Sequence, residues 1–346
     1  MEPVTHFLFG ACLSRAGLNR RTALATATVT LAAEAPDMDV LAEFKGPVFN
    51  FAHHRGFTHS FLGLILVSAT TVGLIYLIWR LRGRRIKDPN LPPRWGLLFL
   101  FAYLAGLTHI LLDFTNNYGV RPFWPFSEKW YSWDIVYIVE PIMLVLMVGG
   151  LVLPSLFSLI NEEVGARSRG PKGRLAATIA LAGIVVMWGM RDYEHRRALN
   201  ALDARTYDGA TPLRVSAYPY MLNPFHWYGL AETKNFFAQV DISGSEVDPG
   251  GDMRIRYKPE ETPVTLAAKR SYLGRVYLDW AQYPVTETEQ LPQNYYYIVR
   301  FKDLRYDYPG LTRRAVLMGS VLLTPDLHVV AETFGFRKPL PVPSAP

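Results

Sequence analysis

The stretch HHRGFTHS, residues 53–60, places three histidines beside an arginine and directly before a long apolar run. Imidazole nitrogens bind transition metals, and together with carboxylates they form the ligand set that zinc takes when thiolates are absent. The chain has a single cysteine, Cys12, which excludes an intrachain disulfide and a cysteine-based zinc site. Any metal centre in this chain must therefore use histidine and carboxylate ligands.

Candidate ligands recur in three other motifs along the first third of the chain. His109 and Asp113 in THILLDF are four residues apart, so a helix presents both side chains on one face. APDMD contains Asp37 and Asp39, and THFLFG contains His6. Taken singly, a histidine near a membrane interface can be only a hydrogen-bonding anchor, and Asp39 can be only a helix cap. A purely structural role fits Asp113 least, because a carboxylate in an apolar helix costs free energy and usually marks a functional site.

These ligand types indicate hydrolytic chemistry at a phosphoryl or acyl centre. A catalytic zinc site leaves one position open, and water bound there ionises near neutral pH. More than four candidate ligands suggest two ions, with the two oxygens of Asp113 as the natural bridge. Arg55 offers a planar fork that suits phosphate or carboxylate, although contact with a lipid headgroup or with a metal ligand is an equal alternative. Gly56 allows a tight turn, and a helix beginning near Phe61 presents an N-terminus that attracts anions.

The elements that must position these residues are predicted to be membrane helices. Two short apolar pieces, Thr5–Ser14 and Thr22–Ala35, predict a tight helical hairpin within a bundle. Four longer stretches are apolar enough to cross a bilayer, which takes roughly 20 residues. On this topology all the ligand motifs reach the same membrane face. The predicted spans are Phe61–Trp79, Gly96–Phe114, Ile135–Ile160 and Leu175–Met190.

Basic loops predict the orientation of the bundle, since lysine and arginine in short loops collect on the cytoplasmic side. The loops at residues 15–21, 80–94 and 167–174 contain three, six and four basic residues. The opposite loops, at residues 36–60 and 115–134, contain two each. The ligand motifs and the C-terminal part of the chain are therefore expected outside the cytoplasm.

Composition agrees with a membrane protein that carries a soluble part. Half of the 346 residues are hydrophobic, and the formal net charge is +6. Basic loops already explain that charge, so we expect membrane lipids as partners and no nucleic acid. The N-terminus lacks the signal-peptide order of a basic, an apolar and a small-residue region, so this start is expected to be retained.

The second half of the chain changes character after the last predicted span. It shows polar alternation, turn pairs such as YPG, and β-rich runs in NYYYIVRFKDLRY and RRAVLMGSVLLT. We predict a mainly α fold, with a multi-pass helical membrane bundle at residues 1–190 and an extracytoplasmic α+β domain at residues 191–346. Strands are expected after about residue 238. The preceding stretch YPYMLNPFHWYGLAET could cover the site, grip lipid headgroups or simply pack.

The motifs THFLFG, PDMD, HHRGFTHS, HILLD and TNNYGVRPFWPFS, in this order, resemble those of the YdjM-type family of membrane-bound metal-dependent hydrolases. The resemblance covers roughly residues 1–190. That family is distantly similar to the helical zinc-dependent phospholipase C and single-strand nuclease superfamily, which cleaves phosphoesters with clustered zinc ions. Soluble members can use the N-terminal amine as a ligand, whereas five residues precede His6 here. The resemblance implies as ligands His6, Asp39, His54, His59, His109 and Asp113, with Asp37 and His53 as neighbours.

Glu140, in YIVEPIM near the outer end of the third predicted span, is a further candidate metal ligand by the same resemblance. A buried, hydrogen-bonded carboxyl is an equal alternative for this residue. The implied cofactor is Zn²⁺, as one or two ions, or another divalent metal. Arg55 and Asp113 are the candidate catalytic residues.

The function expected from these features is a metal-dependent hydrolase of the inner membrane, acting as a zinc phosphoesterase on a lipid or another anionic substrate at the outer face. A metal-binding sensor, regulator or transporter without turnover is the alternative. Transport is disfavoured because the ionisable residues gather at one end of the predicted bundle. Haem ligation suits the surrounding carboxylates less well than a divalent ion does. An intramembrane zincin is disfavoured because the chain has no HExxH motif.

Overall fold

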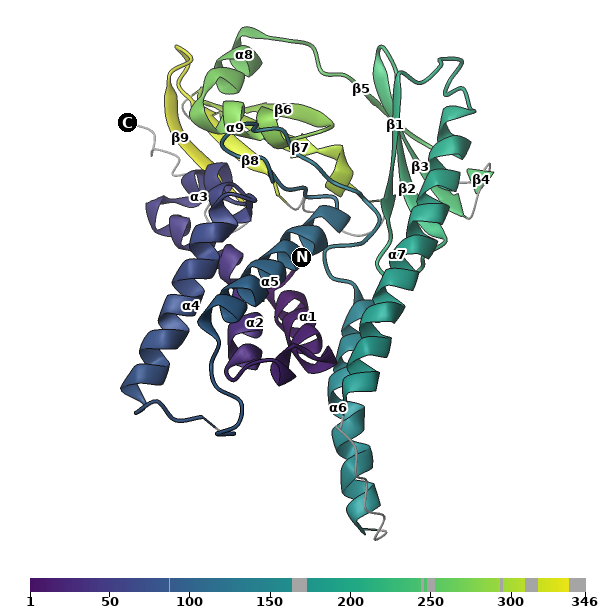
Figure 1. The fold of residues 1–346 in the computed structure, drawn as a ribbon. Coiled ribbons are helices and arrows are strands. Elements are labelled where there is room, and N and C mark those ends of the chain that lie inside the picture. The colour runs from purple at the N-terminus through teal and green to yellow at the C-terminus, as the bar shows by residue number, and fades with distance from the viewer. Residues whose placement is uncertain are drawn as a thin grey trace. The chain divides into compact units, whose positions relative to one another are not determined.

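The chain forms two compact units, one helical and one that contains two β-sheets (Figure 1). The helical unit comprises residues 1–39, 55–196 and 219–225, and the second unit comprises residues 40–54, 197–218 and those from 226 onward. The domain boundary predicted at residue 190 stays a prediction. The computed structural model describes residues 1–86, 88–163, 173–243, 246–247, 253–292, 295–308 and 317–335.

Among the described residues, three helices are long and apolar enough to cross a membrane: α4 (Gly63–Leu81), α5 (Trp95–Thr115) and α7 (Arg174–Asp203). A fourth helix, α6 (Pro141–Glu163), has a shorter apolar part that ends at Phe157. Apolar segments of this length form helices because every backbone N–H and C=O group must be paired within the segment when lipid surrounds it. The ends of α4 and α5 lie within two residues of the first two predicted spans.

The third and fourth predicted spans differ from the observed helices. Ile135 and Val136 are not helical, and their amides donate to the carbonyl of Thr115 at 3.0 and 3.1 Å. The chain thus runs beside the end of α5 before Pro141 begins α6. The last helix is longer than predicted, because α7 continues through a polar stretch to Asp203.

The predicted N-terminal hairpin is confirmed. It consists of α1 (Pro3–Ala16) and α2 (Ala25–Glu34), joined by the 3-10 turn η1 (Leu18–Arg20). The two helices cross closely at Gly10, where an added Cβ would lie 2.7 Å from the Cβ of Ala33. This close approach is possible only without a side chain, and it sets the position of α2, which packs along α5.

Short segments between α2 and α4 carry the APDMD and HHRGFTHS motifs. They are the 3-10 segment η2 (Ala35–Lys45), α3 (Pro47–His53) and the 3-10 turn η3 (Phe57–His59). Ser60 connects η3 to α4, because its Oγ accepts from the Gly63 amide at 2.9 Å and donates to the carbonyl of η3's first residue at 2.8 Å. These two hydrogen bonds of Ser60 hold η3 against the start of α4.

The second unit contains two sheets, with strand orders β1-β2-β3-β4, where β5 also pairs with β3, and β6-β7-β8-β9. The second sheet is antiparallel throughout. The helices α8 and α9 accompany these strands, so the two-unit chain is mainly helical with an antiparallel β region after the last span. The elements are β1 (Arg214–Pro219), β2 (His226–Glu232), β3 (Phe236–Ser243), β4 (Glu246–Val247), β5 (Arg254–Tyr257), α8 (Pro263–Arg270), α9 (Tyr272–Trp280), β6 (Pro284–Gln290), β7 (Tyr297–Asp303), η4 (Leu304–Tyr306), β8 (Gly319–Leu323) and β9 (Val329–Phe334).

The prediction that strands begin after about residue 238 is wrong, because β1 and β2 precede that point. β2 ends the stretch YPYMLNPFHWYGLAET, and its five central residues are all buried. A strand buried on both faces lacks the alternation of polar and apolar residues by which strands are recognised. Part of RRAVLMGSVLLT, residues 313–316, lies outside the described residues, and the rest contains β8.

Candidate metal centre

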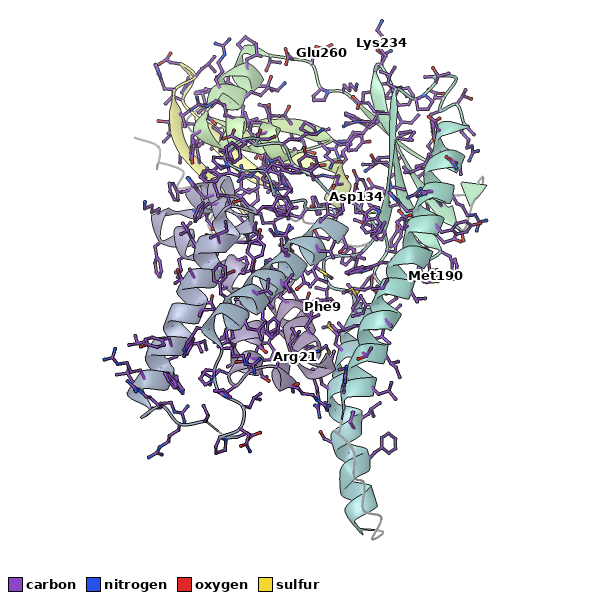
Figure 2. The ribbon with its side chains drawn as sticks, viewed as in Figure 1. Phe9, Arg21, Asp134, Met190, Lys234 and Glu260 are labelled. Carbon is purple, nitrogen blue, oxygen red and sulfur yellow. The ribbon has the colours of Figure 1, made fainter. Side chains whose placement is uncertain are left out.

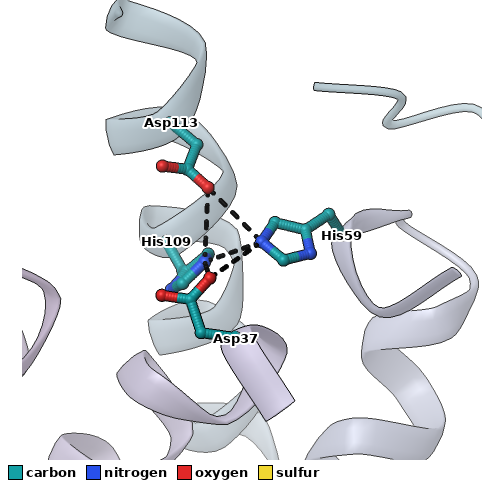
Figure 3. A group of neighbouring side chains, drawn as sticks. All are labelled: Asp37, His59, His109 and Asp113. Atoms are coloured by element: carbon teal, nitrogen blue, oxygen red, sulfur yellow. Dashed lines mark hydrogen bonds and ion pairs between the residues drawn. The ribbon is translucent and has the colours of Figure 1, made fainter. Parts of the chain in front are cut away.

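Asp37, His59, His109 and Asp113 converge within the helical unit (Figure 3). η2 carries Asp37, η3 carries His59, and α5 carries the other two residues one helical turn apart. One ligand-type atom of each residue lies within 4.8 Å of those of the other three. The side chains of His59, His109 and Asp113 are fully buried, whereas that of Asp37 is 20% exposed. Asp37 therefore marks the side from which the cluster is reached.

The distances from each imidazole nitrogen to the other three ligand atoms suit tetrahedral coordination. Nε2 of His59 lies 3.3 Å from one oxygen each of Asp37 and Asp113, and Nε2 of His109 lies 3.4 Å from the same two oxygens. The two Nε2 atoms are 3.0 Å apart. A tetrahedral ion with bonds of about 2.0–2.1 Å separates its ligands by about 3.3–3.4 Å, because the edge of a tetrahedron is about 1.63 times the centre-to-corner distance.

Hydrogen bonds on the far side of each imidazole turn its Nε2 lone pair toward the cluster. Nδ1 of His109 lies 2.7 Å from the carbonyl of Ala33, which can only accept, so Nδ1 carries the proton. Nδ1 of His59 lies 3.4 Å from a carboxylate oxygen of Asp39 and 3.0 Å from the hydroxyl of Thr58. The Asp39 carboxylate favours the same tautomer for His59, so both Nε2 atoms are available as acceptors.

The cluster thus presents only electron-pair donors to its centre. Oδ2 of Asp113 is buried and has no hydrogen-bond donor among the described residues. Two carboxylate oxygens and two imidazole lone pairs that face one another without a proton between them repel, unless a cation lies among them. This donor set fits a divalent metal ion, and it contains the ligand types that such ions take from histidine and carboxylate.

The protonation behaviour of the two groups outside the helical spans agrees with metal binding. Burial lowers the pKa of His59 to about 3, although the neighbouring Asp37 carboxylate opposes this shift. Burial alone would raise the pKa of Asp37, but the neighbouring His109 and His59 side chains hold it well below its usual value. At neutral pH His59 is therefore neutral and Asp37 is ionised, which are the forms that bind a metal.

The carboxylate of Asp113 has a second set of partners at its other oxygen. Oδ1 accepts from Nη2 of Arg55 at 2.7 Å and from the amino group of Met1. His6 lies on the same side, with Nε2 3.5 Å from Oδ1 and its ring stacked on that of His109 at a centroid distance of 3.7 Å. Two nitrogen donors therefore satisfy Oδ1, while Oδ2 faces the cluster.

Arg55 is held in place on all sides and is only 5% exposed. Nη1 donates to the carbonyl of Gly119 at 3.0 Å, and its guanidinium lies 4.7 Å from the ring centroid of Tyr118. Its own amide donates to a carboxylate oxygen of Asp39 at 2.8 Å. Arg55 thus connects η2, α5 and the loop after α5, and its contact with Asp113 indicates that it positions this carboxylate.

The remaining sequence candidates lie outside the four-residue cluster. Asp39 sits behind His59 and Arg55, where it orients both. The ring of His53 is exposed, stacks on Phe49 and shares a hydrogen bond of 2.8 Å with the carbonyl of the same residue. His54 caps the end of α3 in the second unit.

Glu140 is also not part of the cluster. Its carboxylate accepts from Nη2 of Arg191 in α7 at 2.8 Å, and both side chains are fully buried. Glu140 is thus a buried and paired carboxyl in the structure, which is the alternative to a metal ligand considered for it from the sequence.

Sequence reasoning missed three features of this centre. The amino group of Met1 reaches Asp113 although five residues precede His6. The carbonyls of Ala33 and Gly119 orient His109 and Arg55, and backbone atoms carry no signal in the sequence. The motif TNNYGVRPFWPFS directly after α5 was the available signal for the support of Arg55, since it contains Tyr118 and Gly119.

Comparison with known proteins confirms the resemblance to the YdjM-type family. The model of the family described as YdjM inner membrane protein matches residues 1–196. The chain is also similar to the uncharacterized protein YfhP of Bacillus subtilis (strain 168), with 27% identity over 155 residues. This match covers 42% of the chain and 43% of the relative, so the chain spans less than half the length of the curated relative that it matches. No solved structure gives a significant match.

Proposed function

The chain belongs to the YdjM inner membrane protein family, and from this premise we propose that it is a membrane-embedded, metal-dependent hydrolase. Its reaction is zinc-dependent cleavage of a phosphoester, and its substrate is a lipid or another anionic molecule. A metal-binding sensor, regulator or transporter is the second candidate, and it shares the same metal site.

The observation that carries this proposal is the buried set of four converging acceptors, from Asp37, His59, His109 and Asp113. Each imidazole Nε2 lies 3.0 to 3.4 Å from the other three acceptors, which matches a tetrahedral ion with short bonds and favours zinc over larger cations. Zinc held by these four residues would supply a Lewis acid, and its ability to take a fifth ligand would let it activate water or polarise a phosphoryl or acyl oxygen.

The protein's own residues prepare the site for that chemistry. The Ala33 carbonyl and the Asp39 carboxylate orient the two imidazoles, so both Nε2 lone pairs already face the position of the ion. Arg55 fixes Asp113 and compensates part of its charge. The partly exposed Asp37 marks the side on which a substrate would approach the ion.

Hydrolysis is tested with the full chain purified in detergent. We expect bound zinc and turnover of at least one substrate among phosphodiesters, phosphomonoesters and phospholipid vesicles. His109→Ala should lose both zinc and turnover, because it removes one ligand and leaves three. His53→Ala is the matched control from the HHRGFTHS motif and should retain both, since its ring is exposed and lies outside the cluster.

Arg55→Ala tests, in the same assay, the loss of a residue that positions Asp113 but does not itself bind the metal. It should retain zinc, because no donor to the ion is removed, and it should lower turnover by about tenfold or more, the size of effect typical for lost orienting contacts around a metal site. If wild type holds zinc yet hydrolyses none of these substrates, and His109→Ala changes only transport or signalling, the non-catalytic candidate replaces the hydrolase.

The orientation proposed for the chain places the metal centre and the C-terminal unit outside the cytoplasm. It is supported by the basic residues of loops 15–21, 80–94 and 167–174. Reporter fusions at Asp88 and after Pro346 should report opposite compartments. Identical compartments for the two fusions would refute this orientation without affecting the metal centre.

A further inference from the structure

A pocket of about 720 Å³ lies in the helical unit, apart from the metal centre. Its walls come from α1, α2 and α5, and its rim comes from η1 and the first residue of α7. Figure 2 shows Arg21, on this rim, far from Asp134 at the other end of the unit. The walls include Leu13, Val29 and Leu104, and the rim includes Arg20, Arg21 and Arg174.

The rim arginines have no acidic partner among the described residues. The salt bridges of the described chain include none that involves Arg20, Arg21 or Arg174. Nε of Arg174 donates to the carbonyl of Ala16 at 3.0 Å, which orients the guanidinium at the rim without neutralising it. Beside it Gly17 has a φ of +155°, and its missing side chain leaves room next to this guanidinium.

The pocket combines this uncompensated positive rim with an apolar wall that continues onto the surface of a candidate membrane span. Leu104, on α5, lines the pocket and is 43% exposed. A volume of this size falls in the range of sites for whole small molecules, and it exceeds what one inorganic anion fills. The occupant that matches these features is amphiphilic, with an anionic head and an apolar tail.

We propose that this pocket binds an anionic phospholipid, with its phosphate on the arginine rim and an acyl chain along the wall that includes Leu104. Basic pockets between membrane helices recognise such headgroups by charge, and each arginine near the membrane surface adds to the attraction. The bilayer that surrounds the candidate spans supplies this lipid directly. The proposal requires a membrane location, and it does not depend on metal binding or hydrolysis.

The test measures lipid binding to the full chain by native mass spectrometry and by the shift of the thermal unfolding midpoint. The probes are phosphatidylglycerol and phosphatidylcholine with identical acyl chains, and glycerol 3-phosphate as a headgroup without chains. We expect phosphatidylglycerol to bind and to raise the midpoint, phosphatidylcholine to bind at least tenfold more weakly, and glycerol 3-phosphate to have no effect.

Substitutions of residues that line the pocket test whether the lipid binds there. Arg20→Ala combined with Arg21→Ala should weaken phosphatidylglycerol binding about tenfold or more. Arg82→Ala combined with Arg85→Ala removes the same charge from exposed positions that do not line the pocket, and it should leave binding unchanged. Leu104→Trp should weaken phosphatidylglycerol binding because the larger side chain fills the apolar wall.

Three results would overturn the proposal: equal loss in both double variants, equal binding of the two lipids, or unchanged binding in Leu104→Trp. Each points to diffuse attraction to the membrane surface in place of a defined pocket. If glycerol 3-phosphate alone raises the midpoint as much as the lipid does, the occupant is a free phosphate compound. Monodisperse elution and an unchanged midpoint without lipid confirm that each variant is folded.

Discussion

Asp113→Ala is expected to abolish metal binding by the purified chain while the protein still inserts into the membrane. The substitution removes the buried Oδ2 that faces Nε2 of His59 and His109 at 3.3 and 3.4 Å. It also removes the acceptor for Arg55 and for the Met1 amine. This one side chain therefore connects α5 to Met1, ahead of α1, and to the HHRGFTHS motif. We expect at least a hundredfold loss of affinity, more than the 10–100-fold typical for residues that only orient metal ligands.

Metal content per chain and membrane yield measure this effect separately. Asp39→Ala is the informative comparison, since this carboxylate touches Nδ1 of His59 and not the cluster centre. It should reduce affinity within the 10–100-fold range and retain some metal at saturation. The metal-centre assignment is wrong if Asp113→Ala binds zinc as wild type does.

Arg191→Met is expected to destabilise the helical unit by about 3–5 kcal/mol, the usual cost of leaving one partner of a buried ion pair alone. Nη2 of Arg191 lies 2.8 Å from a carboxylate oxygen of Glu140, and neither side chain is exposed. The pair connects α7 to the residue that precedes α6. Without the arginine, the carboxylate must be protonated or must draw in water.

Unfolding in detergent, followed by heat or denaturant, measures the change. Glu140→Gln combined with Arg191→Met should recover most of the loss, since it leaves no buried charge. The matched control is Arg196→Met on the same helix, because Arg196 pairs with Asp192 at 2.9 Å but is 73% exposed. An exposed pair contributes about 0–1 kcal/mol, so equal effects of Arg191→Met and Arg196→Met would contradict the prediction.

Glu140→Gln also decides between the two roles considered for this residue. The structure pairs it with Arg191, so its substitution should change stability and leave metal content unchanged. A ligand role would give the opposite pattern. The sequence could not separate these roles, because Glu140 and Arg191 are far apart in the chain and a carboxylate before a proline suits both.

The sequence determined the kind of site and the kind of environment. The absence of further cysteines restricts the ligands to histidine and carboxylate, and the four-residue spacing of His109 and Asp113 places them on one helical face. An apolar segment long enough to span a bilayer can form few structures other than a helix. The ends of α4 and α5 were therefore predicted to within two residues. These features depend on composition and local periodicity, which a sequence shows directly.

Tertiary structure decided which candidates meet. Asp37 and Asp39 are two residues apart in a 3-10 segment, where each residue turns the chain by about 120°, so only one of them can face the cluster. The family resemblance implied Asp39 as a ligand, whereas the structure places Asp37 there and puts Asp39 behind His59.

The same holds for the three histidines of HHRGFTHS. Their positions in the structure depend on where α3 ends and η3 begins. His59 alone enters the cluster, because the hydrogen bonds of Ser60 hold η3 against α4. The pairing of Arg55 with Asp113, and of Arg191 with Glu140, joins residues that are far apart in the chain. Such contacts depend on how helices pack, since a buried charge takes the partner that packing brings nearest, and no local pattern in the chain encodes that partner.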